Sequence, residues 1–493
     1  MTYHGELRDW HVRIGLTAVV LAVFGGTLWA PFVYDDHALL VDSSISSSGG
    51  WWMVWRPMQT RPLTYFTFWC NHQLGGSEAA GYHAVNLALH LGAALLLFAV
   101  LGRLLPKSAA VGAAFLFAVH PLAVEPVAYV FARSTLLATV FSLACLLFWV
   151  RGRHWAAVGW FGLALLAKEE CAALPVVLGL LHFSISRNRA ERAPVAAMLG
   201  LAAAAVARVA VVSSMVAGSG AGAQAGVRWQ DYFLTQGLVI ARYLRMLVAP
   251  YGMSVDPDVA VETGWVSWLA WALIAASMVA ALRWFDRAGP GFWWISGLLL
   301  LLPTSSLFPA ADLAADRRMY LPMIAFAALA ALLLERIGRR EVMVAAVVVL
   351  GAVSWWRTQV WRSEIALWSD AMEQAPGKLR PRLQLARVEE PRRAMELLAE
   401  AKRMDPDDPR AAMETGRLLL REGRFADALR EFGLAVALAP RDANAYSNRG
   451  VALWGMGLRR EAIRDFQIAL RLDPNHPVAK INLEKLTATA APK

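Results

Sequence analysis

Residues 13–36 read RIGLTAVVLAVFGGTLWAPFVYDD, an apolar run that ends in Tyr34-Asp35-Asp36. The run is long enough to cross the hydrocarbon core of a bilayer, which takes roughly 20 residues of α-helix. Ionised side chains beside hydrocarbon are costly and tend to mark function. Two adjacent carboxylates at this place therefore predict chemistry at the membrane surface, although the tripeptide alone leaves a solvated loop start as the alternative.

Composition places the whole chain among integral membrane proteins. Its 493 residues are 57% hydrophobic and 17% charged, with a mean hydropathy of +0.43 and 21 tryptophans, which is too apolar for a soluble domain. The net charge of +10 sits in short arginine clusters between apolar runs. That distribution indicates membrane topology, and we exclude nucleic-acid binding.

Neither a disulfide framework nor a metal centre is evident. The three cysteines, Cys70, Cys145 and Cys171, are scattered and have no metal-ligand spacing. Two adjacent acids such as Asp35 and Asp36 could bind a divalent cation, but no further ligand set accompanies them. We therefore assign no metal ligand and no cofactor.

Further apolar stretches predict an all-α, multi-spanning helical bundle of about eleven spans. The expected spans are 13–33, 82–102, 108–119, 127–150, 154–167, 171–186, 194–214, 265–282, 291–308, 319–334 and 341–358. The segment 232–250 is long enough to span, yet Arg242 and Arg245 share one face, so we expect it to lie at the interface. The membrane domain then covers 1–360, with long outer loops at 34–81 and 213–264.

The basic residues orient these spans. With the N-terminus inside, every cytoplasmic turn is basic, as the positive-inside rule requires. These turns carry Arg103, Lys107, Arg151, Arg153, Arg187, Arg189, Arg192, Arg283, Arg287, Arg336, Arg339 and Arg340. An odd number of spans places the C-terminus outside. The Ala-, Arg- and Trp-rich composition favours a bacterial inner membrane, with the periplasm as the outer compartment.

The C-terminal third, 361–493, is charged and periodic. Residues 409–442 and 443–476 align as two units of the roughly 34-residue tetratricopeptide period, with small residues where paired helices cross and a proline after the second helix. A shorter unit precedes them, and the second helix of a still earlier one lies around 368–376. This pattern predicts an extracytoplasmic α-solenoid that binds an acceptor protein or peptide. A structural cap on the membrane domain is the alternative.

The outer segments collect polar residues on one face of the membrane. They are Tyr34, Asp35, Asp36 and Arg61 in the first loop, His83 at the start of the next span, His120, Glu125 and Arg133 in the second loop, Lys168 and Glu169 in the third, and Asp316, Arg317, Arg318 and Tyr320 in a later one. One explanation covers them: a cavity holds a phosphate under basic side chains while a carboxylate takes a proton.

A lipid-linked phosphosugar fits such a cavity. Its polyprenyl tail would lie between helices, and its phosphate would contact Arg133, Lys168, Arg317 and Arg318, since arginine and lysine both suit phosphate. Neighbouring side chains of an extended segment point to opposite sides, so only one aspartate serves as the base. We choose Asp35 as the base and give Asp36 an orienting or acceptor-binding role. The other residues of the set support the sugar or the acceptor.

Several members of this set have a structural alternative. His83 and His90 lie on one helix face and suit packing, and His120 precedes a proline and can cap a turn. Glu125 could pair with Arg133 instead of acting on substrate. Tyr320 could belong to an interfacial aromatic belt.

The order of the motifs resembles a known family. The segments PFVYDDHALL, RPLTYFTFW, GYHAVNLALHLGAALLLF, HPLAVEPVAYVFARSTLLA, LLAKEECAALP, ARYLRMLVAPYGMSVDP, SSLFPAADLAADRRMYLP and WRSEIALWSDAM resemble the transmembrane and tetratricopeptide-repeat O-mannosyltransferases and their bacterial relatives. The resemblance implies a C-type glycosyltransferase that transfers a sugar, with inversion, from polyprenyl phosphate to a protein hydroxyl. The extra acid and the cysteine of KEECAALP, and DRRMYLP in place of a Glu-Arg form, depart from the usual pattern and leave the sugar open.

Two other functions remain open from the sequence. A polysaccharide or O-antigen-type ligase or polymerase also uses lipid-linked donors, but its arginines and histidines would be expected in a large late outer loop. A membrane scaffold that presents its repeats to partners needs no catalytic residue. A transporter would show internally repeated halves, which we do not find.

Overall fold

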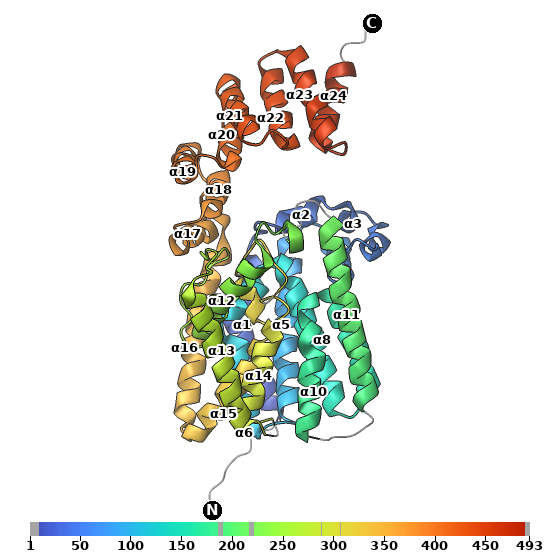
Figure 1. Ribbon diagram of the computed structural model, residues 1–493, viewed down its shortest axis with the longest axis vertical. Coiled ribbons are helices and arrows are strands. Elements are labelled where there is room, and N and C mark those ends of the chain that lie inside the picture. The colour runs from blue at the N-terminus through green and yellow to red at the C-terminus, as the bar shows by residue number, and fades with distance from the viewer. Residues whose placement is uncertain (1–8, 186–190, 216–220, 287, 306, 489–493) are drawn as a thin grey trace, which may run out of the picture. The chain divides into compact units, whose positions relative to one another are not determined.

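The computed structural model describes residues 9–185, 191–215, 221–286, 288–305 and 307–488. Within these ranges every named element is a helix, and the one β contact is an isolated bridge between Ala221 and Ala310. The chain divides into two compact units, Met1–Ala366 and Leu367–Lys493, which Figure 1 colours from blue to red along the sequence. Arg187, Arg189 and Arg287, assigned above to inner turns, lie outside the described residues.

The first unit is a bundle of apolar helices. In the described ranges, six helices are long and apolar enough to cross a membrane, namely Asp9–Trp29, Ala79–Leu101 (α5), Val130–Val150, Arg192–Met215 (α11), Trp265–Trp284 and Arg340–Arg362. The pair Lys107–Val119 and Pro121–Ala128, bent by 54°, would make a seventh. Helices also form at the other expected spans, but they are shorter. The total of about eleven spans therefore remains a prediction.

The shorter helices complete the bundle. They are α9 (His154–Ala167), α10 (Leu174–Ile185), α14 (Pro290–Leu301) and α15 (Met323–Ile337). The helix α12 (Trp229–Val248) is not among the spanning candidates. It buries Tyr232, Tyr243 and Met246 while Trp229 and Val248 stay exposed, which is the two-faced character expected of a helix at a membrane surface.

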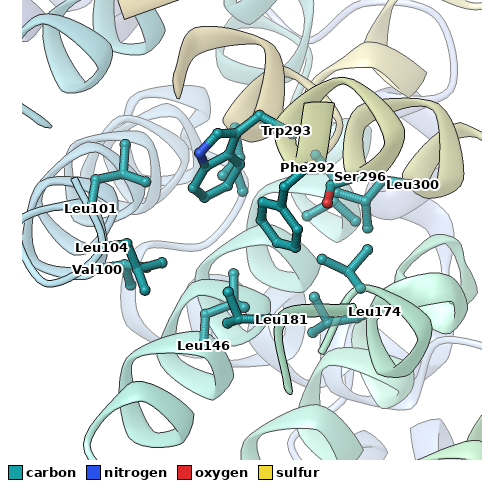
Figure 2. A pocket seen from close by; sticks show the side chains of 14 residues that line it. Val100, Leu101, Leu104, Leu146, Leu174, Leu181, Phe292, Trp293, Ser296 and Leu300 are labelled. Carbon is teal, nitrogen blue, oxygen red and sulfur yellow. The ribbon is translucent and has the colours of Figure 1, made fainter. Parts of the chain in front are cut away.

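Figure 2 shows an apolar cavity between α5, α8 (Arg133–Val150), α10, α14 and α15. Its volume is about 20 Å³, and Phe292, Trp293 and Leu146 are among the side chains that line it, with Ser296 as a polar neighbour. A cavity of that size holds one water at most, and an apolar lining leaves it dry. No titratable group lines it, so it is a packing feature of the membrane unit.

The second unit is a stack of helix pairs, α18 (Leu379–Val388) with α19 (Pro391–Met404), α20 (Pro409–Arg421) with α21 (Phe425–Leu438), and α22 (Ala443–Gly455) with α23 (Arg459–Leu472), followed by α24 (Pro477–Ala488). Fully buried alanines and a phenylalanine join each of the last two pairs, and leucines and alanines join α18 and α19. Gly416 faces the ring of Phe432, and Gly450 faces Phe466 in the same way. The small residues of the period therefore allow two helices to approach closely.

This close approach gives a stability prediction. A Cβ atom at Gly416 would lie 2.6 Å from the Phe432 ring, so Gly416→Ala should destabilise α20 and α21 by about 1–3 kcal/mol through overpacking. Gly433→Ala in α21 meets nothing within 4 Å and should instead stabilise the helix by about 0.5–1 kcal/mol. Hydrogen exchange of the α20 and α21 amides in the full chain measures both. Equal protection in the two variants would contradict the packing argument.

Candidate functional site

The two adjacent aspartates occupy different environments at the start of α2 (Asp36–Val41). Tyr34 precedes them with a φ of 51°, a left-handed conformation that is uncommon for a residue with a side chain. Asp36 is fully buried, and its carboxylate accepts backbone N–H bonds from Phe131 at 2.7 Å and Val33 at 3.2 Å. Asp35 is exposed and accepts a bond from the Tyr129 hydroxyl at 3.0 Å. The turn thus presents one acid to solvent and buries the other.

A buried arginine supports the segment that holds both acids. The Tyr129 carbonyl accepts from Asn86 Nδ2 at 3.2 Å, and Asn86 Oδ1 accepts from Arg133 Nε at 2.9 Å. Arg133 is 0% exposed, donates to the Tyr82 carbonyl at 2.9 Å, and stacks 4.5 Å from the Phe68 ring centre. Its described contacts therefore lie inside the bundle. Through Asn86 they hold the Tyr129–Phe131 segment in place.

Glu125 pairs with Arg317, 192 residues further along the chain. Glu125 accepts from Arg317 Nη1 at 2.6 Å and from its backbone N–H at 3.0 Å. The side chain of Glu125 is 8% exposed and that of Arg317 is 27% exposed. The alternative pair of Glu125 with Arg133 does not form. The Arg317 side chain is therefore only partly covered, and a further anion can reach it.

The remaining charges of the late loop are tied to their surroundings. Asp316 pairs with Arg242 of α12 and accepts the Ser254 backbone N–H at 3.2 Å. Arg318 donates to the carbonyls of Asp312 at 2.7 Å and Leu313 at 3.2 Å. Asp316 and Arg318 therefore shape the loop that presents Arg317.

A small cavity of about 20 Å³ lies against Glu125 and Asp316, and Ser254, Arg357 and Trp361 also line it. The Trp361 ring packs 5.9 Å from that of Tyr129, the partner of Asp35. Trp361 thus packs against the partner of Asp35 and lines the same cavity as Glu125. The second outer loop and the late loop thus meet near this side chain.

Lys168 and Glu169 belong to a third cluster. Lys168 Nζ contacts Glu170 and the Thr135 hydroxyl, both at 2.6 Å, and Glu169 pairs with Arg61 at 2.8 Å. Burial lowers the pKa of Lys168, and the negative charge of Glu170 partly offsets this lowering. Burial raises the pKa of Glu169, but the Arg61 guanidinium outweighs it and holds that pKa at about 2. Both acids of the turn therefore have a basic partner at neutral pH.

Three further residues of the predicted set are buried among helices. His120 caps the turn at Pro121, because its Nδ1 accepts the Leu122 N–H at 3.1 Å while its Nε2 lies 3.2 Å from the Leu247 carbonyl. Tyr320 is fully buried and lies 2.7 Å from His90 Nδ1, so it is no interfacial belt residue. His83 is also fully buried.

Sequence reasoning missed Tyr129, Arg242, Arg357 and Trp361. Arg357 lies 5% exposed in the last turn of the helix Arg340–Thr358 and donates to the Met253 carbonyl at 2.8 Å. A charge inside an expected span is itself a signal of function, so Arg357 could have been found. Tyr129 could not, because its contact with Asp35 joins positions 94 residues apart.

The burial of Asp36 has a measurable consequence for stability. Burial raises its pKa to about 8, against the opposing bonds from Val33 and Phe131. The folded state then binds the proton more tightly than the unfolded chain, whose carboxyl titrates near 3.8. The free energy of unfolding should therefore fall as pH rises from about 4 to about 8.

We expect Asp36→Asn to remove most of this pH dependence and to lower the melting temperature at pH 5, because one amide nitrogen cannot accept a backbone N–H. Asp35→Asn, at the exposed acid, should keep the pH dependence. Melting temperatures between pH 4 and pH 9 test both variants. An unchanged slope in Asp36→Asn would show that another group titrates.

Known proteins resemble the chain in both of its parts. The tetratricopeptide repeat family model matches residues 443–476. A Caenorhabditis elegans protein O-mannosyl-transferase (F38B6.6) is 26% identical over 78% of this chain and 60% of its own length. The Drosophila melanogaster protein O-mannosyl-transferase Tmtc1 is 34% identical over 32% of the chain and 20% of its own length. The resemblance drawn from the motifs is thereby confirmed, although the chain spans less than two thirds of the length of these relatives.

Solved structures resemble parts of the chain more distantly. An Archaeoglobus fulgidus oligosaccharyltransferase tethered to an acceptor peptide covers 80% of this chain and 58% of its own, with 13% identity and a TM-score of 0.36. The first tetratricopeptide domain of Spaghetti (RPAP3), bound to an HSP90 peptide, covers 20% of this chain and 81% of its own, with 30% identity and a TM-score of 0.20.

Proposed function

We propose that this chain, a relative of protein O-mannosyl-transferases, is a membrane glycosyltransferase that moves a sugar from a polyprenyl phosphate to a Ser or Thr hydroxyl of a protein. Mannose is the sugar that its relatives' names suggest. The observation that carries the proposal is the exposed Asp35, held by the Tyr129 hydroxyl at 3.0 Å. Trp361 packs against Tyr129 and lines the same cavity as Glu125, the partner of Arg317.

The reaction needs one base and a cationic surface. The acceptor hydroxyl gives its proton to Asp35 as its oxygen bonds to the anomeric carbon. The bond between that carbon and the phosphate oxygen breaks at the same time, and polyprenyl phosphate leaves with the electron pair. Attack from the face opposite the phosphate inverts the anomeric centre. The leaving phosphate gains a negative charge and needs no acid.

Arg317 is the strongest candidate for the donor phosphate, because its side chain stays 27% exposed while it pairs with Glu125. An arginine can hold a phosphate through two parallel hydrogen bonds even while it pairs with a carboxylate at another nitrogen. Lys168 adds positive potential from the neighbouring turn. We leave Arg133 out of the phosphate site, since its described bonds point into the bundle.

Tyr129 acts on Asp35 as a positioning residue. Its hydroxyl fixes one carboxylate oxygen, and the ring is held by Trp361 and Phe131, at centroid distances of 5.9 and 6.2 Å. Asp35 is itself exposed, so the acceptor can reach its carboxylate from solvent. Asp36 stabilises the turn by accepting the backbone N–H groups of Phe131 and Val33.

The repeats are proposed to bind the acceptor on the extracytoplasmic side. Stacked tetratricopeptide pairs form a continuous groove that suits an extended peptide. In this assignment the repeats choose the acceptor and the membrane unit performs the transfer.

A transfer assay tests the function. The full chain, reconstituted in lipid bilayers, is incubated with radiolabelled polyprenyl-phosphate mannose or polyprenyl-phosphate glucose and with a Ser- and Thr-rich peptide. Label on the peptide from at least one donor supports the proposal, and the preferred donor names the sugar. Label that appears only on a lipid-linked glycan would indicate the ligase or polymerase. A chain that transfers from no donor would be a scaffold.

A further inference from the structure

The first outer loop carries a compact group of exposed aromatic side chains. The segment Gly50–Met58, which includes the 3-10 helix Gly50–Trp55, exposes Trp51 by 49%, Trp52 by 54%, Trp55 by 44% and Met58 by 47%. Val54 of the same segment is 1% exposed and packs into the protein, which holds the segment in place. Water alone does not favour so many apolar rings in a short stretch. Another surface is expected to cover them.

The segment has a fixed place in the fold. Trp55 packs 6.0 Å from Phe66 of α4 (Pro62–Gly75), and Phe66 in turn stacks on Trp69 at 5.8 Å. The Trp69 indole donates to the Ser47 carbonyl at 3.0 Å. The exposed rings are therefore presented by a structured element of the loop.

A spanning helix sets the height of this element relative to the bilayer. Arg208 of α11 donates to the carbonyls of Pro57, at 3.2 Å, and of Gln59. Figure 1 draws α2 and α3 (Ser43–Ser46) at the end of the bundle where α11 finishes. The segment that follows them along the chain is thus joined to α11 near this end.

The length of α11 allows the depth of Arg208 in the bilayer to be estimated. The α11 helix of Arg192–Met215 is about 36 Å long at 1.5 Å per residue, and the hydrocarbon core is about 30 Å thick. If the middle of α11 lies at the middle of the bilayer, the backbone of Arg208 lies about 8 Å inside the hydrocarbon boundary, a depth that a snorkelling arginine side chain can bridge. Its guanidinium and the Pro57 and Gln59 carbonyls then meet at that boundary.

We propose that Gly50–Met58 is a membrane anchor whose tryptophans lie among the phospholipid headgroups of the leaflet where α11 ends. Tryptophan suits this layer, because its ring is apolar and its N–H can bond to headgroup oxygens. Arg56, 5.3 Å from the Trp52 ring, adds a cation for lipid phosphate. The exposed apolar side chains of α11, among them Val206 and Val211, continue the same lipid-facing surface.

The anchor also places the aspartates. Asp35 lies in the same loop, so it would stand near the level of the lipid phosphates, where a lipid-linked donor presents its own phosphate. This last step rests on the proposed function. The depth of the tryptophans does not rest on the proposed function, because it is measured without any transfer reaction.

Site-directed spin labelling tests the anchor. Cys70→Ser removes the one half-exposed cysteine, since Cys145 and Cys171 are buried. A nitroxide is then attached in bilayers at Trp52→Cys or, as a second variant, Trp51→Cys. Val206→Cys on α11 serves as the lipid reference and Arg460→Cys in the repeats as the water reference. Accessibility to oxygen and to a water-soluble nickel chelate gives the depth.

We expect the labels at 51 and 52 to fall between the two references, at the headgroup level. Nickel accessibility equal to that of the label at 460 would overturn the proposal. Exclusion of both reagents would also overturn it, because that result would mean that protein covers the tryptophans. If one variant fails to fold, the other measures the same depth.

Discussion

Asp35→Asn should lower the rate of sugar transfer by about 10² to 10⁴, the usual contribution of a general base. The amide cannot take the proton of the acceptor hydroxyl. Its oxygen can still accept the Tyr129 hydroxyl, which lies 3.0 Å from the carboxylate, so the turn should keep its conformation. The loss should appear in kcat, with little change in the binding of the lipid-linked donor.

Asp42→Asn is the matched control. Asp42 is another carboxylate of the same loop, but it caps α3 by accepting the Ser44 backbone N–H at 2.8 Å. We expect normal transfer and a stability loss of about 1 kcal/mol or less, typical of a weakened cap. Full activity in Asp35→Asn would assign the base to another group.

Arg317→Gln has the second largest expected effect, because it removes both the proposed phosphate ligand and the partner of a buried acid. The Glu125 side chain is 8% exposed and loses its charged partner, and breaking a buried pair from one side costs about 3–5 kcal/mol. The proposed loss of phosphate contact should lower transfer by at least about 10², since charge stabilisation at a reacting group is of that size.

A double variant separates the two roles. Glu125→Gln with Arg317→Gln removes both charges, so most of the stability should return while transfer stays low. Arg228→Gln is the surface control, since the Arg228 side chain is 79% exposed beside Asp231 and its loss should change neither quantity measurably. Melting temperature and transfer rate are read on the same preparations. Recovery of activity in the double variant would make the pair structural only.

The fold features that depend on short-range patterns could be predicted. The tetratricopeptide period places small residues against aromatics within one helix pair, and Gly416 meets Phe432 as that pattern requires. Apolar runs likewise coincide with helices throughout the described part of the membrane unit. Both patterns involve residues close together in the chain, so they can be recognised in a single sequence.

The pairing of charges could not be predicted in the same way. Glu125 has a basic residue, Arg133, two helical turns away, yet it pairs with Arg317 through a contact between distant loops. Arg133 is enclosed by α4 and α5 because Thr67, Tyr82 and Asn86 supply its acceptors. Such partners depend on how the helices pack. From the residue types alone, several basic residues could pair with the same acid equally well.

The contrast between an exposed Asp35 and a buried Asp36 also determines the path of the proton. A proton taken up by Asp35 can pass straight to the water on its own side of the membrane, because that side chain already faces solvent. Turnover then moves no net charge across the bilayer. The transfer rate should be independent of the transmembrane voltage and of the proton gradient, so the enzyme would work equally well in a de-energised cell.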